Sequence, residues 1–105
     1  MKQRINISQL EPDAYKILFE MEDYLSRTDV SFTIRELIKI RVSQINKCAY
    51  CITIHTKDAR KAGETEQRIY ALSAWEESPL FSDEERVVLA FTEEVTKISK
   101  HGVTD

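Results

Sequence analysis

The chain of 105 residues contains only two glycines and two prolines. An all-β protein with many tight turns needs more of both, because these residues supply the backbone conformations that turns require. The composition is otherwise ordinary for a soluble globular protein, with 42% hydrophobic and 31% charged residues. We therefore expect one helical domain over residues 1–105, which is a usual length for a single small domain.

Long apolar runs and basic clusters are also missing. No uninterrupted apolar run approaches the length of a membrane span, and residues 1–13 lack the apolar stretch of a secretory signal. The 15 basic and 18 acidic residues are spread along the chain without long blocks of one sign, which argues against a nucleic-acid surface. These absences predict a cytoplasmic protein with no membrane or nucleic-acid partner. In that compartment a Cys-x-x-Cys pair is usually catalytic or metal-binding.

Apolar residues recur every three or four positions along most of the chain, which predicts an all-α fold. We expect helices at about residues 12–25, 33–45, 47–62, 66–75 and 83–101. Thr33 and Glu36 have the spacing of a capping box at the start of the second helix. Asn46 is suited to cap the start of the third, and Gly63 to end it.

The last expected helix has the clearest pattern. Ser82 and Glu85 form a second capping box, and Gly102 ends the helix. One face carries an apolar stripe of Val87, Val88, Phe91, Val95 and Ile98. The other helices must also enclose Glu36 and His55, so part of this stripe should stay uncovered in one chain. Because large apolar patches are uncommon on monomers, we expect a homo-oligomer with helix-on-helix contacts.

Both cysteines lie in one short motif, Glu36-x11-Cys48-x2-Cys51-x3-His55. On a helix, positions i, i+3 and i+7 share one stripe, so both thiols and the imidazole would lie on one face. A helix N-terminus and a neighbouring imidazole each stabilise a thiolate. A second thiol nearby can resolve a sulfenic acid into a disulfide. These features favour a dithiol redox site.

Two structural interpretations fit the same residues. Both cysteines and His55 could bind zinc, with a fourth ligand from Glu36, His101 or a partner chain, and the protein would then be a zinc-binding helical interaction module. Alternatively the cysteines are inert and pack as small apolar side chains.

Three other residues suggest ordinary structural roles. We expect His101 to be a surface residue favoured by the C-terminal dipole of its helix. Tyr50 and Trp75 are expected in the core.

The motif within IRVSQINKCAYCITIHTKDARKAG resembles the core motif of the alkylhydroperoxidase D-like (AhpD-like) branch of the carboxymuconolactone decarboxylase superfamily. RINISQLEPDAYK and ESPLFSDEERVVLAFTEEVT are similar to the segments before and after that motif, so the resemblance covers nearly the whole chain.

This resemblance implies an all-α fold, homo-oligomers that are often trimers or hexamers, and a peroxidase or disulfide reductase active in antioxidant defence. It implies that Cys51 attacks the peroxide and that Cys48 resolves the product. His55 would take the proton from Cys51, and Glu36 would relay it onward through water. A lactone decarboxylase of the same superfamily, which needs proton transfer but no cysteine pair, is the alternative activity.

The chain departs from the family pattern in two places. Tyr50 stands where well-studied members have a further histidine, and a phenol shuttles protons at neutral pH less readily than an imidazole. Family members also usually continue with further helices after the position of Asp105, so we expect the remaining surface to be covered by a partner chain or left exposed.

The identity of the attacking thiol and the source of electrons are separate questions. Proximity to the helix N-terminus favours Cys48 as the more acidic thiol, whereas the resemblance favours Cys51. Because no glycine-rich nucleotide motif is present, we expect electrons from a dithiol, or from a lipoyl or thioredoxin-like protein. We expect no bound cofactor and no metal.

Overall fold

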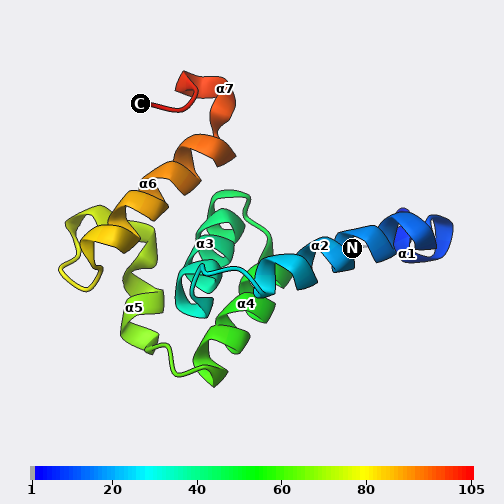
Figure 1. The fold of residues 1–105 in the computed structure, drawn as a ribbon, viewed down its shortest axis with the longest axis horizontal. Coiled ribbons are helices and arrows are strands. Elements are labelled where there is room, and N and C mark those ends of the chain that lie inside the picture. The colour runs from blue at the N-terminus through cyan, green and yellow to red at the C-terminus, as the bar shows by residue number, and fades with distance from the viewer. Residues whose placement is uncertain (1) are drawn as a thin grey trace. The chain divides into compact units, whose positions relative to one another are not determined.

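The computed structural model describes residues 2–105 and contains helices but no strand among them (Figure 1). This confirms the predicted all-α fold. Contacts along the chain divide it into two compact units, residues 1–31 and residues 32–105. That residues 1–105 act as one domain stays a prediction.

The N-terminal unit contains a short helix α1 (Ile7–Leu10) and a longer helix α2 (Pro12–Ser26). Pro12 occupies the first turn of α2, where a missing N–H costs nothing. None of the residues of α2 is buried, and its exposed apolar side chains include Ile17, Leu18, Phe19 and Met21. The expected helix over 12–25 is confirmed. The four residues of α1 are too few to show a periodic pattern, and the sequence did not predict this helix.

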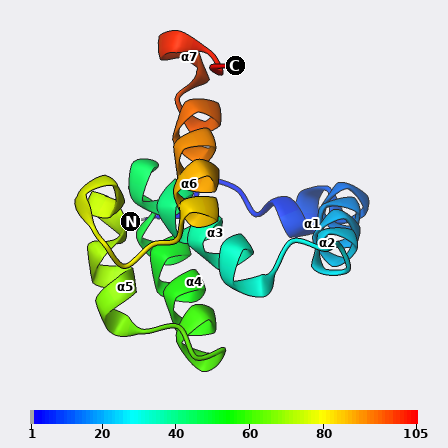
Figure 2. The same ribbon diagram turned by 60° about the vertical axis from the view of Figure 1, so that its left-hand side comes forward.

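The second unit is built around α3 (Phe32–Ile45). This helix packs against both α4 (Ala49–Lys61) and α6 (Asp83–Thr96) (Figures 1 and 2). Between α4 and α6 come α5 (Glu66–Ala71) and a 3-10 helix, η1 (Leu72–Glu77). The buried apolar core consists of Leu37, Ile40, Ala59, Leu72, Trp75, Phe81 and Leu89. Trp75 is therefore a core residue, as expected.

The end of the chain differs from its prediction. The capping box of Ser82 and Glu85 is present at the start of α6, but α6 stops at Thr96 and a separate short helix, α7 (Ile98–His101), follows. Lys97 between them has φ −110° and ψ 37°. The hydroxyls of Thr92 and Thr96 donate to carbonyls one turn earlier, and such bonds bend helices. The unbroken helix to residue 101 was wrong.

Two predicted helix caps were also wrong, although the second helix begins within one residue of its predicted start. Helix α3 begins at Phe32, so Thr33 lies inside its first turn and does not cap it. Asn46 does not cap the next helix, because α4 begins after Cys48. The prediction for Gly63 is confirmed: it follows α4 with φ +96°, and bonds from Gly63 N to Arg60 O and from the next residue to Ala59 O close the helix end.

Among the described residues 2–105, none of the helices has both the length and the apolar character needed to cross a membrane.

Candidate thiol and acid-base site

A tight reversal between α3 and α4 places the first cysteine. The peptide N–H of Cys48 donates to Ser43 O, and that of Lys47 donates to Gln44 O. These two bonds form a Schellman motif, with Lys47 at the position of positive φ (55°). Most side chains rarely adopt this backbone conformation, and glycine is usual there. Because the motif closes α3 at Lys47 and Cys48, Asn46 lies at the end of α3 and cannot cap α4.

Cys48 is consequently the N-cap of α4. Its backbone is extended (φ −90°, ψ 98°), and its Sγ accepts a bond of 3.3 Å from the N–H of Cys51. The two cysteines form a disulfide, with their Cα atoms 5.3 Å apart. Both cysteines are half-buried. Because Cys48 is the N-cap, the disulfide lies in the first turn of α4, at the positive end of the helix dipole.

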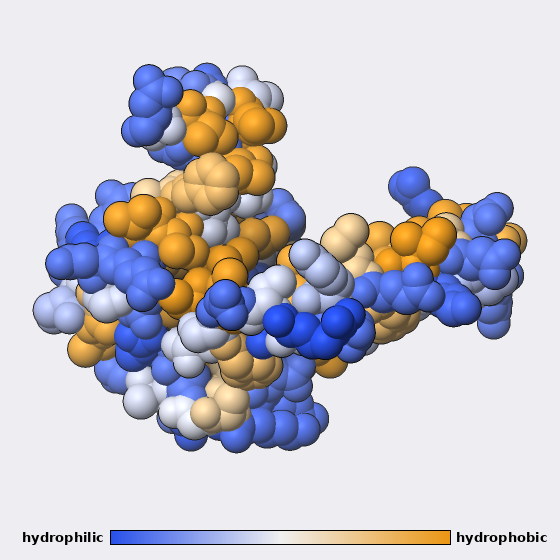
Figure 3. Space-filling view, viewed as in Figure 1, coloured by the Kyte–Doolittle hydropathy of each residue, from blue (hydrophilic) through white to orange (hydrophobic). Residues whose placement is uncertain are grey.

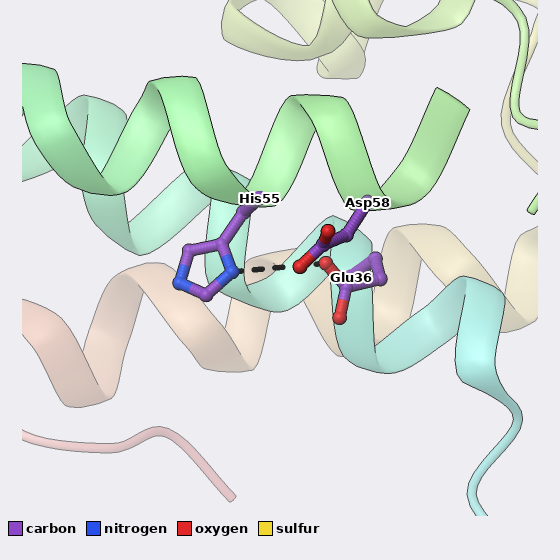
Figure 4. Close-up of side chains that lie close together, drawn as sticks. All are labelled: Glu36, His55 and Asp58. Atoms are coloured by element: carbon purple, nitrogen blue, oxygen red, sulfur yellow. Dashed lines mark ion pairs between the residues drawn. The ribbon is translucent and has the colours of Figure 1, made fainter. Parts of the chain in front are cut away.

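His55 lies on α4 one turn after Cys51, a spacing that brings two side chains onto the same part of the helix surface. Glu36 reaches this face from α3 and is only 5% exposed. His55 Nδ1 lies 3.7 Å from Glu36 Oε2 (Figure 4). The other carboxylate oxygen, Oε1, lies 3.6 Å from Lys39 Nζ. The structure therefore brings Glu36 to His55 through the packing of α3 on α4.

The two facing atoms lack ordinary partners. Glu36 Oε2 and His55 Nδ1 are both buried and neither makes a hydrogen bond. A separation of 3.7 Å is too long for a direct hydrogen bond. Buried polar atoms are nearly always satisfied, so this pair has capacity for a proton, a water or an ion. A cavity of about 10 Å³ also adjoins Glu36, which is room for about one water molecule.

Asp58 is the third acid-base group at this place, and sequence reasoning missed it. It is exposed and follows His55 by three positions on α4. One oxygen of Asp58, one of Glu36 and a ring nitrogen of His55 all lie within 4.8 Å of one another. Figure 4 shows the carboxylates of Asp58 and Glu36 beside the imidazole. The i, i+3 spacing in the sequence HTKD could have indicated this neighbour.

Two other candidate residues lie elsewhere. His101 is exposed in the last turn of α7, as predicted for a surface residue, and is not one of the three converging groups. Tyr50 is 76% exposed, so its expected place in the core was wrong. It is the second residue of α4, and its position on the helix turns it toward solvent.

A second, partly buried cluster fixes α3 against its other neighbours. Glu93 of α6 accepts hydrogen bonds from Arg41 Nε (2.8 Å) and Trp75 Nε1 (3.0 Å). Burial by itself would raise the pKa of Glu93, but the bonds from Trp75 and Arg41 outweigh it and lower the pKa. The charged pair therefore holds α6 to the face of α3 that carries Arg41, and α3 in turn carries Glu36.

The sequence profile of the carboxymuconolactone decarboxylase family matches residues 12–94. The chain is 50% identical over 105 residues to the uncharacterised protein YdfG of Bacillus subtilis, covering all of this chain and 71% of that protein. It is 31% identical over 67 residues to the uncharacterised protein YnjA of Escherichia coli, covering 64% of this chain and 37% of that protein.

A crystal structure from Agrobacterium tumefaciens, of the protein ATU0492, superposes with a TM-score of 0.93 at 38% identity. The match covers 99% of this chain and 71% of that one. ATU0492 is described as a protein of unknown function and as a candidate AhpD antioxidant defence protein. With the family profile and this structural match in agreement, the chain belongs to the carboxymuconolactone decarboxylase family, in its AhpD-like branch.

Proposed function

We propose that this protein is a dithiol oxidoreductase that reduces peroxides at Cys48 and Cys51 and is itself reduced by an external dithiol. The observation that carries the proposal is the disulfide in the first turn of α4, one helical turn from an imidazole that faces a buried carboxylate. The likeness to ATU0492 supports an antioxidant role.

In the first step the Cys51 thiolate attacks the distal oxygen of a hydroperoxide. A sulfur–oxygen bond forms, the oxygen–oxygen bond breaks, and the alkoxide leaves with one proton as an alcohol. Cys51 becomes a sulfenic acid, and the peroxide is reduced by two electrons.

In the second step the thiol of Cys48 attacks the sulfenic sulfur of Cys51. A disulfide forms and water leaves, which gives the state seen in this structure. A reduced dithiol then exchanges with this disulfide through a mixed disulfide. Both cysteines return to thiols, and the donor leaves as its own disulfide.

His55 and Glu36 serve proton transfer in this scheme. His55 takes the proton of the Cys51 thiol, and Glu36 accepts a proton from the buried face of the imidazole, through a water molecule. The unpaired Oε2 and Nδ1 atoms, 3.7 Å apart, support this arrangement. Tyr50 is a neighbour of Cys51 on the exposed side of α4 and has no part in the relay.

The test is peroxide consumption with dihydrolipoamide or reduced thioredoxin as the donor. We expect thiol-dependent turnover that Cys51→Ser abolishes. Cys48→Ser should keep one round of peroxide reduction and accumulate a sulfenic acid at Cys51, detectable by dimedone labelling and mass spectrometry. Labelling of Cys48 in the Cys51→Ser variant instead would reverse the two roles. No turnover with either donor would contradict the proposal.

The lactone decarboxylases of the superfamily supply a direct contrast. Such an activity would use His55 and Glu36 for proton transfer and would survive Cys48→Ser and Cys51→Ser together. Lactone turnover that withstands both changes and disappears in His55→Ala would replace the peroxidase proposal.

A further inference from the structure

We propose that Glu36, His55 and Asp58 form a binding site for one Zn²⁺ ion, and that Zn²⁺ bound there inhibits the thiol reaction. The second half rests on the proposed function. The first half concerns only the three side chains and can be tested without any enzymatic assay.

The three ligand atoms already converge. His55 and Asp58 project from one face of α4, and Glu36 meets them from α3 (Figure 4). Their ligand atoms lie within 4.8 Å of one another, and the separation between His55 Nδ1 and Glu36 Oε2 is 3.7 Å. Ligand atoms about 2.0–2.2 Å from a tetrahedral zinc ion are about 3.4 Å apart. Binding therefore needs only a small inward movement, most of it by the exposed side chain of Asp58.

Burial supplies an independent reason for a ligand. Glu36 is 5% exposed, yet its Oε2 atom has no hydrogen-bond partner, and neither has the buried Nδ1 atom of His55. An unsatisfied buried acceptor carries a desolvation penalty. A cation between the two atoms would satisfy both at once, because each offers a lone pair when Glu36 is ionised and Nδ1 is unprotonated.

The donor set suits zinc among the divalent ions. One imidazole nitrogen and two carboxylate oxygens are typical zinc ligands, and three protein ligands leave a fourth position open to water. Magnesium and calcium prefer oxygen alone. Lys39 engages the opposite oxygen of Glu36, at 3.6 Å. With one ammonium against two carboxylates, the local charge is about −1 before the ion binds, which favours a divalent cation.

This site differs from a zinc site that uses the cysteines. Cys48 and Cys51 are joined in a disulfide, and zinc binds the thiolate form of cysteine. The oxidised protein would therefore bind Zn²⁺ through oxygen and nitrogen alone. Zinc binding by the oxidised protein would therefore distinguish a site without the cysteines from a site that uses them.

Zinc at this position would compete with the proton relay. The ion would occupy the Nδ1 atom of His55 and the Oε2 atom of Glu36, which are the two atoms between which the proton moves in the proposed reaction. Because His55 could then pass no proton to Glu36, turnover should fall as the site fills.

The direct test is isothermal titration calorimetry of the oxidised protein with ZnCl₂. We expect one Zn²⁺ per chain, with a dissociation constant at least tenfold weaker in Asp58→Asn and no binding in His55→Ala. The matched control Asp29→Asn removes the same charge from an exposed residue outside the site. It should leave the affinity unchanged, as should His101→Ala. Circular dichroism confirms that each variant is folded.

Three results would overturn the site: no binding by the oxidised protein, equal affinity in Asp58→Asn, or loss of binding in His101→Ala, which would mean an adventitious surface ion only.

Cobalt adds a spectroscopic check. Co²⁺ should give visible d–d bands without the intense near-ultraviolet bands of cobalt–thiolate bonds, and thiolate bands in the oxidised sample would contradict the assignment.

Inhibition is measured separately, with each variant compared with its own zinc-free rate. Because the dithiol donor itself binds zinc, inhibition is compared at known free Zn²⁺: the wild type should be inhibited near the dissociation constant found by calorimetry, and half-inhibition of Asp58→Asn should need at least ten times more free Zn²⁺. Zinc binding without any peroxidase turnover would sustain the site and refute the proposed function. Turnover without zinc binding would refute the site alone, and binding without inhibition would refute the inhibitory role.

Discussion

Arg68 connects three segments of residues 32–105 through one guanidinium group. It donates to Glu64 from Nε (3.0 Å), to both oxygens of Glu85 (2.9 Å each) and to the carbonyl of Leu80 (2.7 Å). The paired bonds to Glu85 are the geometry in which arginine binds carboxylate most strongly. The hydrogen bonds from Arg68 lower the pKa of Glu85, and together with those from Ser82 they outweigh the opposing effect of burial.

The residue-scale prediction concerns Glu85→Gln. Glutamine can keep the capping geometry but loses the charge, so we expect the free energy of unfolding at pH 7 to fall by about 1–3 kcal/mol. Because the folded-state pKa of Glu85 lies below the ordinary value of 4.5, its contribution is complete above that pH. It is lost as the pH falls through the lower folded-state pKa. Urea unfolding at several pH values measures this.

The control for this prediction is Glu84→Gln, which removes a charge from the same turn of α6 at an exposed position. It should change stability little. A difference between wild type and Glu85→Gln that stayed constant down to pH 3 would contradict the charge explanation.

At the scale of the helices, the C-terminal ends of α3 and α4 have the same hydrogen-bonded motif with different residues. Lys47 closes α3 and Gly63 closes α4, both with positive φ. A methyl group added at Gly63 would meet no atom within 4 Å. Any loss of stability caused by a side chain there would therefore come from the backbone conformation, because the side chain would not clash with another atom.

We predict that Gly63→Ala lowers the free energy of unfolding by about 1–2 kcal/mol, because an alanine side chain disfavours the left-handed backbone region. Gly63→Asn should lose less, since asparagine tolerates that region better. Thermal and urea unfolding of the two variants tests the order. Equal stability of Gly63→Ala and the wild type would show that the helix end rearranges at no cost.

At the scale of the whole molecule, we consider the apolar face of α6 that the other helices of residues 32–105 leave exposed. Val87 is 70% exposed, Phe91 is 55% exposed and Val95 of the same helix is also exposed, whereas the exposed Ile98 belongs to α7. The space-filling view shows apolar residues gathered over α6 (Figure 3). Exposed apolar faces of this kind commonly mark interfaces. The homo-oligomer expected from the sequence stays a prediction, and this face is where we expect its contacts.

We expect light scattering at micromolar concentration to give a mass that is a multiple of the chain mass. Phe91→Asp should shift the distribution toward smaller species, because a charge buried in an apolar interface is costly. Tyr70→Asp is the control, as an exposed aromatic residue on α5 outside the stripe. A stable wild-type monomer, or equal effects of the two substitutions, would contradict an interface at this face.

Signals that act within one or two helical turns were sufficient for much of the fold. Apolar periodicity indicated the long helices, the hydrogen-bond exchange of Ser82 and Glu85 marked the start of α6, and Gly63 marked the end of α4. These features depend on neighbours three or four positions away, which the sequence displays directly. The i, i+4 placement of Cys51 and His55 follows for the same reason.

Only the tertiary structure decided where α3 turns into α4 and which side chains meet across them. Because the helix-end motif closes α3 at Lys47, the N-cap of α4 is Cys48 and not the predicted Asn46, and the disulfide lies in the first turn of α4. The approach of Glu36 to His55 required α3 to pack on α4. Asp58 lies beside them at an exposed position three residues after His55 on α4, whereas Tyr50 near the start of α4 is exposed to solvent. Contacts between residues about twenty positions apart depend on the rotation of each helix about its axis, and the packing of the whole core sets that rotation.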